Sequence, residues 1–386
     1  MYLILIYMDI ILSVFAVEEL LLLAAVLVLF VVELVYWLRV FGRVAFQRIN
    51  IQPVTNGQLP VSIILSARNE YELLQETLPL ILTQDYPEFE VVVVNDGSED
   101  DTEILLASMQ GAYPRLVFRT IVKDEKFRHN KKMALGVGIK AAKYDLLLFI
   151  DADCYPSGNR WLQAMQRYFT ERKDIVVGYT RFANTALWIR ADHFMQALHV
   201  LGKALLRKAY MGMHSNLAYR KPLFFSNKGF DMRVTHGLRE DIVFINKTAT
   251  HMNTAVALGS EATTVSTLHY SAGNWLRYRA NELRSLDLSM HGPHYPALGE
   301  ALFRLLFFAG IVAAAVVLCE NYIVLLALAA ALVIRFTIQV ILFARAQRRL
   351  GEKGLLPILW LWDICYPFYY LFLIFIAKFR NKQTWR

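Results

Sequence analysis

Two aspartates, Asp151 and Asp153, follow a continuous apolar run at residues 146–150, with one alanine between them. Such a run is typical of a buried strand in a parallel sheet, and ligands bind beyond the carboxyl ends of these strands. Carboxylate oxygens suit Mg²⁺ or Mn²⁺, and Mg²⁺ is commonly held by one or two carboxylates plus substrate phosphates. A polar turn after the strand explains the same residues. The pair alone therefore leaves metal-assisted phosphate chemistry and a structural turn both open.

Two more polar clusters follow predicted strands. Arg68-Asn69-Glu70 comes after the strand at 61–65, and Asp96 comes after the strand at 89–94. Helices are predicted at 72–82 and 131–143, and a later strand at 175–182. Alternating strands and helices indicate a largely parallel, doubly wound α/β sheet. Parallel strands would bring all three carboxylate clusters to one edge, which favours a binding site there.

Long apolar segments surround this mixed region. The chain has 386 residues, of which 56% are hydrophobic, and a net charge of +8. Residues 10–38 are nearly all apolar, which exceeds the ~20 residues needed to cross a bilayer. Further apolar blocks cover 301–318, 322–344 and 355–377. We expect one helix, a soluble domain and then three helices, with Glu18, Glu19 and Glu33 at helix ends or facing other helices.

The positive charges lie mostly beside these apolar segments. Anionic lipid headgroups and control of membrane orientation explain them, so nucleic acid is not an expected partner. Arginines and lysines flanking the first and third apolar blocks place the soluble domain in the cytoplasm: Arg39, Arg43, Arg48, Arg345, Arg348, Arg349 and Lys353. The tail, with Lys378, Arg380, Lys382 and Arg386, also favours the cytoplasm. The last block therefore either crosses and leaves a basic tail outside, or is re-entrant around Pro357, Asp363 and Pro367.

Four segments of the soluble region occur in a characteristic order: residues 62–70, 91–102, 131–135 and 149–153. Together they resemble family 2 glycosyltransferases over roughly residues 61–284. The resemblance implies a Rossmann-like GT-A fold. The arrangement of one helix before this domain and three after it is similar to the membrane-bound members of the family.

The resemblance also implies roles for individual side chains. Glu70 and Asp96 would contact the nucleoside of a nucleotide-sugar donor, with a UDP-sugar favoured, and Lys131 its base or diphosphate. Asp151 would lie against the ribose or sugar and share the metal, and Asp153 would be the principal ligand of Mg²⁺ or Mn²⁺. Such a metal neutralises the diphosphate as it leaves. Asn216 falls in the segment at 212–221, which resembles the part of the family beneath the transferred sugar and acceptor.

Glu240 and Asp241 form a second acidic pair. Acidic residues are favoured in the first turn of a helix, which is the structural interpretation. Adjacent helical residues point about 100° apart, so the two cannot act as a joint dyad. The resemblance implies that Asp241 is the catalytic base of an inverting single displacement, taking a proton from the acceptor hydroxyl. Glu240 would lie in the acceptor or diphosphate region.

An amphipathic helix is predicted at 275–290, where processive members carry a Gln-X-X-Arg-Trp motif. The corresponding residues here, Asn281 to Ser285, keep Arg284 but lack the Gln and the Trp. A missing Trp removes a stacking platform for the acceptor sugar, which favours transfer of a single sugar. Arg284 would still pair with the diphosphate, as arginine forks do with phosphate oxygens.

These observations together predict a membrane-anchored, metal-dependent, inverting glycosyltransferase of the cytoplasmic membrane. Its acceptor would be lipid-linked or membrane-proximal, in cell-envelope polysaccharide or glycolipid synthesis. The expected units are a membrane helix at 1–45, a catalytic domain at 46–272, an interfacial helix at 273–298 and membrane segments at 299–386. Two alternatives remain open: a processive polysaccharide synthase, and a non-catalytic scaffold subunit of a membrane complex.

Overall fold

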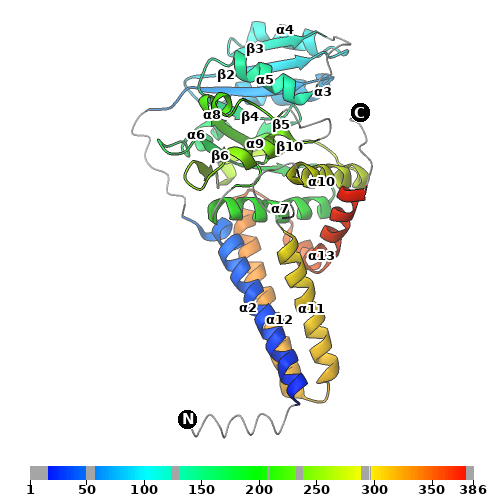
Figure 1. Cartoon of the computed structure of the whole chain (residues 1–386). Coiled ribbons are helices and arrows are strands. Elements are labelled where there is room, and N and C mark those ends of the chain that lie inside the picture. The colour runs from blue at the N-terminus through cyan, green and yellow to red at the C-terminus, as the bar shows by residue number, and fades with distance from the viewer. Residues whose placement is uncertain are drawn as a thin grey trace.

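The computed structural model describes residues 16–48, 57–122, 130–206, 209–231, 238–287, 295 and 297–379. An α/β domain sits at one end of a bundle of long helices (Figure 1). We call the helices at 17–46, 298–317 and 322–349 the stem. The start of the first predicted span, at 10–15, lies outside the described residues. The same holds for the end of the predicted amphipathic helix at 288–290 and for the tail residues Arg380, Lys382 and Arg386.

The central sheet has seven strands in the order β3-β2-β1-β4-β8-β6-β9. Strands β3, β2, β1 and β4 are parallel, and Ile63 of β1 pairs with both Val91 and Leu148. β8 is antiparallel to both β4 and β6, so the second half of the sheet is mixed. The strands are β1 Val61–Ala67, β2 Phe89–Asp96, β3 Leu116–Ile121, β4 Leu146–Phe149, β6 Ile175–Val177, β8 Leu217–Arg220 and β9 Thr254–Val256.

Helices cover both faces of this sheet, which explains the uninterrupted apolar runs in the strands. Successive side chains of a strand point to opposite faces. Ile64 and Val92 join a core with α5, α7 and α9, whereas Ile63 and Val91 join a second core with α3, α4 and α6. The helices are α3 Tyr71–Leu82, α4 Thr102–Ala112, α5 Lys131–Ala141, α6 Trp161–Gln166, α7 Leu187–Leu206 and α9 Glu240–Thr248.

A second, three-stranded sheet has the order β5-β10-β7, with β5 Cys154–Pro156, β7 Tyr179–Phe182 and β10 Thr263–Ser266. The single strand predicted at 175–182 was therefore wrong, because β6 and β7 belong to different sheets. The chain changes sheet at Gly178, where an added Cβ would lie 2.5 Å from the Asn216 side chain. Asn216 donates to Tyr179 O and Ala262 O, both at 2.8 Å, and so joins the two sheets.

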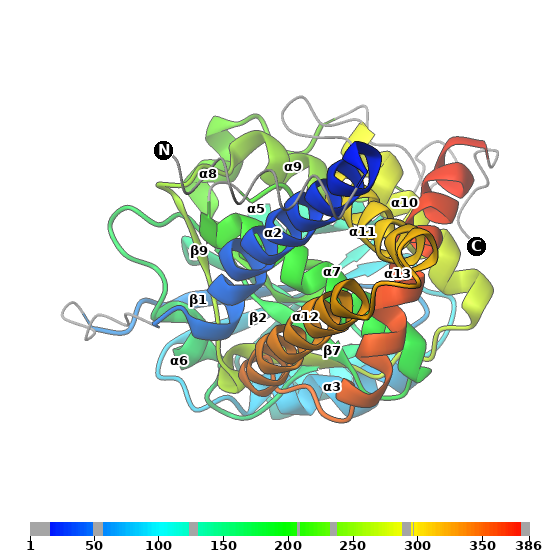
Figure 2. The same ribbon diagram turned by 90° about the horizontal axis from the view of Figure 1, so that it is seen from below.

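Four helices are long and apolar enough to cross a membrane, as predicted: α2 Val17–Phe46, α11 Leu298–Val317, α12 Tyr322–Arg349 and α13 Leu356–Phe379. α2 packs against α11, α12 and the domain helix α7. Gly202 of α7 lies on the backbone of α2, because an added Cβ would be 2.4 Å from Val40 O. Figure 2 shows α2, α11 and α12 projecting beneath the α/β domain. The stem and the domain therefore share a close helix crossing.

A buried cluster of five charged residues links the four apolar helices. Arg335 contacts Glu33 at 2.6 Å and Asp363 at 2.7 Å, and Arg304 contacts Asp363 at 2.6 Å. Arg304 also pairs with Glu300 of its own helix. Glu33 faces other helices, as expected from the sequence, and Glu18 and Glu19 lie in the first turn of α2. Removing one partner of such a buried pair is strongly destabilising, so the cluster fixes how these helices assemble.

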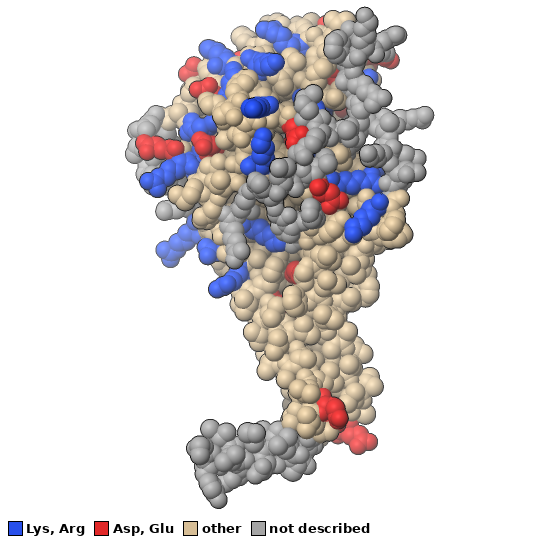
Figure 3. Space-filling model, viewed as in Figure 1, with Lys and Arg blue, Asp and Glu red and all other residues tan. Residues whose placement is uncertain are grey.

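Charge is distributed unevenly along the molecule (Figure 3). Lys and Arg side chains cover the domain and its junction with the stem, whereas the stem shows mainly uncharged surface and acidic residues at its far end. Arg39 and Arg43 lie near the domain end of α2, and Arg345, Arg348 and Arg349 near the domain end of α12. Arg349 also donates to Val44 O at 3.1 Å and to Gln47 O.

Candidate active site

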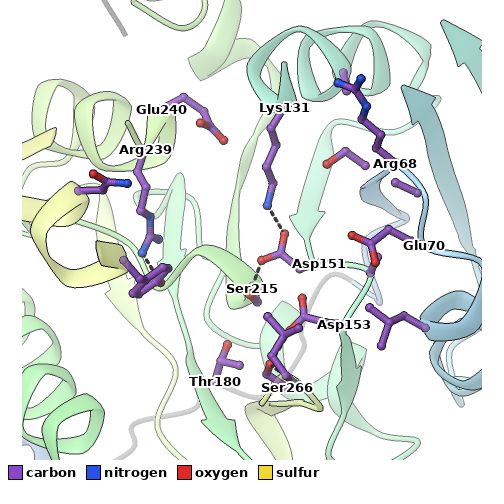
Figure 4. A pocket seen from close by; sticks show the side chains of 18 of the residues that line it. Arg68, Glu70, Lys131, Asp151, Asp153, Thr180, Ser215, Arg239, Glu240 and Ser266 are labelled. Atoms are coloured by element: carbon purple, nitrogen blue, oxygen red, sulfur yellow. Dashed lines mark hydrogen bonds and ion pairs between the residues drawn. The ribbon is translucent and has the colours of Figure 1, made fainter. Parts of the chain in front are cut away.

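A cavity of about 750 Å³ opens at the carboxyl ends of β1, β2 and β4. One wall of this cavity carries Glu70, Asp96, Lys131, Asp151 and Asp153, which were predicted to form one site. Figure 4 shows Lys131 pointing down onto Asp151, with Asp153 below and Glu70 facing them from the other wall. Parallel strand ends thus bring together residues that are up to 83 positions apart in the sequence.

The ends of β1 and β2 are joined by hydrogen bonds that set the position of Glu70. Asn69 N donates to Ser98 Oγ at 2.9 Å, and Glu99 N donates to Asn69 Oδ1 at 2.7 Å. Asn69 adopts a left-handed conformation with φ of 54°, which Asn tolerates better than most residues. Glu70 N then donates to Thr102 Oγ1 at 3.2 Å, so the Glu70 side chain begins at the cavity rim.

Asp151 is held by two side chains from other elements. Lys131 Nζ and Ser215 Oγ each donate to one of its carboxylate oxygens, at 2.5 Å. Lys131 begins α5, whose N-cap Asn130 accepts from Met133 N at 2.8 Å. Burial lowers the pKa of Lys131, but Asp151 and Glu240 outweigh that effect and raise it. Lys131 therefore stays cationic beside the carboxylates.

Asp153 lies deeper, between the two sheets. Its carboxylate accepts hydrogen bonds from Ser266 Oγ and, at 3.3 Å, from Cys154 Sγ. Burial and the neighbouring Asp151 raise the pKa of Asp153, although Ser266 and Cys154 oppose the shift. The negative charge at this point is thus incompletely balanced by the protein.

The residues present fit a hard divalent cation. Within the described residues, no three His, Cys, Asp or Glu side chains gather as a self-sufficient metal site. Asp151 and Asp153 nevertheless supply carboxylate oxygens on one side of an open cavity, and Glu70 faces them. Mg²⁺ and Mn²⁺ prefer oxygen ligands, and one or two carboxylates suffice when substrate phosphates complete the shell.

Glu70 should make the stability of the metal-free protein depend on pH. Burial, followed by repulsion from Asp153, raises its pKa from 4.5 to about 7. The folded state thus binds the proton more tightly, so stability falls as pH rises from about 4.5 to about 7 and then levels off. Glu70→Gln is neutral throughout and lacks this loss. In chelator-treated protein, we expect the melting temperature of Glu70→Gln to exceed that of wild type by a margin that grows as the pH rises from about 4.5 to about 7.

The control for this measurement is Glu72→Gln, an exposed position in the first turn of the same helix. It should follow the wild-type pH dependence. An equal gain from both substitutions would mean that the effect comes from general surface charge rather than from Glu70.

Glu240 and Asp241 occupy different positions at the start of α9. Glu240 lines the cavity, and Figure 4 shows its carboxylate near Lys131. Asp241 is buried and does not line the described cavity wall. Its two oxygens accept hydrogen bonds from Arg239 Nε at 3.2 Å and a terminal guanidinium nitrogen at 2.7 Å. Arg239 itself lines the cavity and also donates to Glu282 and the Tyr278 hydroxyl, both at 2.6 Å.

Two more predicted site residues, besides Asp241, lie away from the described cavity wall. Arg284 of α10 (Ala272–Asp287) turns to the end of α13, where its Nε donates to Ala377 O at 2.8 Å. This position does not support the expected contact with the diphosphate. Asn216 is fully buried between the two sheets and accepts from Trp161 Nε1 at 3.2 Å. Its contacts indicate a structural role beneath the site.

Several cavity residues were not among those predicted. Ser266 comes from β10, whose four residues are too short to stand out in the sequence. Ser215 lies in the segment at 212–221 identified by resemblance, and Arg239 directly precedes the acidic pair Glu240 and Asp241, but neither was given a role. Tyr278 belongs to the predicted amphipathic helix, yet its direction became clear only from the packing of α10 on α9. His193 also lines the cavity; its Nε2 lies 2.7 Å from Thr180 O, and burial lowers its pKa to about 4.

Comparison with known proteins agrees with this geometry. The family model described as Glycosyl transferase family 2 matches residues 62–226. Poly-beta-1,6-N-acetyl-D-glucosamine synthase of Staphylococcus epidermidis is 34% identical over 93 residues, which are 24% of this chain and 21% of the synthase. Glycosyltransferase AglE of Haloferax volcanii is 33% identical over 105 residues, which are 27% of this chain and 33% of AglE. The matches thus span a third or less of these relatives.

A solved structure extends the likeness beyond the matched segment. The mannosyltransferase PcManGT of Pyrobaculum calidifontis, determined in complex with GDP-Man and Mn²⁺, aligns with a TM-score of 0.55 at 21% identity. The alignment covers 87% of this chain and 99% of the mannosyltransferase. The parallel half-sheet, the carboxylates at its strand ends and the structural alignment lead to one conclusion: this chain has a GT-A-like α/β domain, of which residues 62–226 match the Glycosyl transferase family 2 model, and four apolar helices accompany it.

Proposed function

We propose that the protein transfers a single sugar from a nucleotide-sugar donor to a lipid-linked or membrane-proximal acceptor. The observation that carries this proposal is the single cavity wall formed by Glu70, Asp96, Lys131, Asp151 and Asp153. It combines hydrogen-bond acceptors for a nucleoside, a cation for phosphates and oxygen ligands for a metal. The setting would be the synthesis of cell-envelope polysaccharide or glycolipid.

In the proposed donor complex, Asp96 and Glu70 hold the nucleoside at the ends of β2 and β1. Asp96 is almost fully buried, so it can form directed hydrogen bonds to a base or ribose with little competition from water. A UDP-sugar is the favoured donor. Lys131 contacts the diphosphate or base while keeping Asp151 in place, and Asp151 faces the ribose or sugar.

Asp153, assisted by Asp151, is the proposed holder of Mg²⁺ or Mn²⁺. When bound, such an ion neutralises the charge that develops on the departing diphosphate. Ser266 and Cys154 orient the Asp153 carboxylate through their hydrogen bonds. Lys131 adds positive charge on the same side. The protein side chains thus favour departure of the nucleoside diphosphate by electrostatic stabilisation.

Asp241 is the proposed base for the acceptor hydroxyl, and direct attack by that hydroxyl would invert the anomeric carbon. Arg239 fixes the Asp241 carboxylate by donating a hydrogen bond to each of its oxygens. Arg239 also pairs with Glu282, so its positive charge is divided between two carboxylates. Asp241 would reach the acceptor only after Arg239 moves, because Arg239 binds both carboxylate oxygens and lines the cavity in front of them. Glu240 would position the acceptor or the diphosphate.

The distribution of positive charge supports a cytoplasmic active site at the cytoplasmic membrane. The arginines near the membrane segments lie at the domain end of α2 and α12, whereas Glu18, Glu19 and Glu320 lie at the other end. Positively charged loops remain in the cytoplasm. The catalytic unit, proposed at 46–272, would then meet cytoplasmic nucleotide sugars directly.

A processive synthase is the second candidate, and one observation favours it. Tyr278 of α10 is an aromatic residue that lines the cavity, on the helix where processive members carry their Trp. Aromatic rings stack on sugar faces, so Tyr278 could contact the terminal sugar of a growing polysaccharide acceptor. The absent Trp and the outward position of Arg284 favour single transfer instead.

The test is a transfer assay on the full-length protein in lipid nanodiscs. UDP- and GDP-sugars are offered with polyprenyl phosphate or a glycolipid acceptor, with Mn²⁺, Mg²⁺ or a chelator. We expect metal-dependent formation of a product carrying one added sugar. Products with many added sugars would establish the processive synthase. A scaffold subunit would give no product and no metal-dependent heat of UDP or GDP binding in calorimetry.

A further inference from the structure

Helix α13 is attached to the catalytic domain at its first end. Glu352, four residues before α13, is buried and accepts hydrogen bonds from the Tyr179 hydroxyl and an Arg190 guanidinium nitrogen, both at 2.8 Å. Lys353 O also accepts from Arg190 at 2.8 Å. Tyr179 lies on β7 and Arg190 on α7, so this end of α13 is fixed to the base of the α/β domain.

The middle of α13 contacts both the stem and the domain. On the stem side, Asp363 pairs with Arg304 of α11 and Arg335 of α12. The Tyr369 hydroxyl donates to Asp192 Oδ2 of α7 at 2.9 Å. The Tyr366 ring stacks on His199 of α7 with a centroid distance of 6.0 Å. Because α7 belongs to the domain, α13 runs along its base instead of away from it.

The last described turn of α13 also lies at the domain. Arg284 of α10 donates through Nε to Ala377 O at 2.8 Å, and Lys378 Nζ lies 5.6 Å from the centre of the Tyr295 ring. Figure 1 shows α13 beside α10 and α7, whereas α2, α11 and α12 continue away from the domain.

These contacts conflict with a membrane crossing by α13. Its 24 residues extend about 36 Å, which is enough to cross a bilayer. A crossing would place one end at the far membrane surface, where the turn at Glu320 and Asn321 joins α11 to α12. Both ends of α13 instead contact the catalytic domain.

The outer face of α13 is apolar and strongly exposed. Side chains three, four or seven residues apart lie on the same face of a helix. Five such side chains form one exposed stripe, with exposed fractions between 48% and 72%: Leu361, Phe368, Phe372, Phe375 and Phe379. An apolar stripe of this size marks a surface that meets a membrane or a partner. Exposed lysines flank it at both ends, Lys353 and Lys378, where they can reach lipid phosphates.

We propose that α13 lies in the interface of the membrane leaflet next to the catalytic domain, with this aromatic stripe in the lipid, and does not cross the bilayer. The neighbouring helices α2, α11 and α12 already place the base of the domain at that leaflet. Helices of this kind bury their apolar face at the boundary between headgroups and acyl chains. The chain then crosses the membrane three times, and the basic end of α13 stays on the same side as the domain.

Cysteine labelling in sealed vesicles distinguishes the two arrangements. Lys378→Cys reports the end of α13, native Cys319 reports the far end of the stem, and exposed Arg172→Cys reports the domain side. Cys365→Ser removes the exposed thiol of α13, and Cys154 is buried. With a membrane-impermeant maleimide, position 378 should react from the same side as position 172. Reaction from the side of Cys319 would overturn the proposal.

A depth measurement identifies what covers the stripe. Phe372→Cys carries a fluorophore in vesicles of phosphatidylethanolamine and phosphatidylglycerol that contain a nitroxide either at the headgroup or at the end of an acyl chain. We expect stronger quenching by the headgroup nitroxide, and the opposite order for the control Val333→Cys, exposed near the middle of α12. Stronger quenching of position 372 by the deep nitroxide would contradict the proposal. So would quenching by neither nitroxide, which would show that protein, such as a second copy of the chain, covers the stripe.

Discussion

Replacing Asp153 with asparagine is expected to abolish both sugar transfer and metal-dependent nucleotide binding. Asparagine keeps the size of the side chain but removes the charge that attracts a divalent cation. Metal stabilisation of developing charge contributes several kcal/mol, so turnover should fall by on the order of 10³-fold or more. Turnover is measured with a radiolabelled nucleotide sugar, and binding by calorimetry with UDP or GDP in the presence of Mn²⁺.

Ser266→Ala is the matched control for this substitution. It removes the hydrogen bond to the Asp153 carboxylate but leaves the carboxylate itself. Loss of such an orienting partner typically costs about 10–100-fold in metal affinity or activity. Ser266→Ala should therefore retain measurable transfer at high Mn²⁺, whereas Asp153→Asn should not. Wild-type activity in Asp153→Asn would remove the basis for the proposed metal site.

Asp241→Asn is expected to separate catalysis from donor binding. A positioned general base contributes about 10²–10⁴-fold, so kcat should fall by that factor. Donor affinity should stay close to wild type, because Asp241 does not line the described donor wall. The protein should remain folded, since Arg239 keeps its contacts with Glu282 and Tyr278. Steady-state kinetics and calorimetry measure the two quantities independently.

Glu240→Gln provides the comparison, because it changes the neighbouring carboxylate in the same turn of α9. Under our proposal it alters the KM for acceptor or donor more than kcat. The reverse outcome, with an inactive Glu240→Gln and an active Asp241→Asn, would assign the base to the residue that faces the cavity in this structure.

The position of the cavity wall with Asp96 and Asp151 could be predicted because strong local patterns specify the strand ends. Apolar runs such as 91–94 and 146–150 are buried on both faces, so their ends are easily located. Parallel pairing then places Asp96 and Asp151 at the same sheet edge without knowledge of side-chain packing. The long apolar helices were predictable for a related reason, since length and hydropathy suffice.

The side of the cavity that carries Arg239 depends on tertiary packing and was predicted less well. Arg284 carries the right charge for a diphosphate, but the packing of α10 on α13 turns it to a backbone carbonyl. Arg239 faces the cavity only because Glu282 and Asp241, 41 positions apart, meet around it. No periodic sequence pattern predicts contacts between side chains that lie so far apart in the chain. The same limit applies to α13, whose composition fits a crossing helix although both its ends contact the domain.

The close crossing of α7 and α2 at Gly202 has a consequence for how substrates reach the enzyme. With no Cβ in the way, the domain helix α7 rests directly on the backbone of α2. The height of the cavity above the lipid surface is therefore set when the protein folds. Under the proposed function, a membrane-proximal acceptor must then present its hydroxyl at that fixed distance, and acceptors that cannot reach it are excluded.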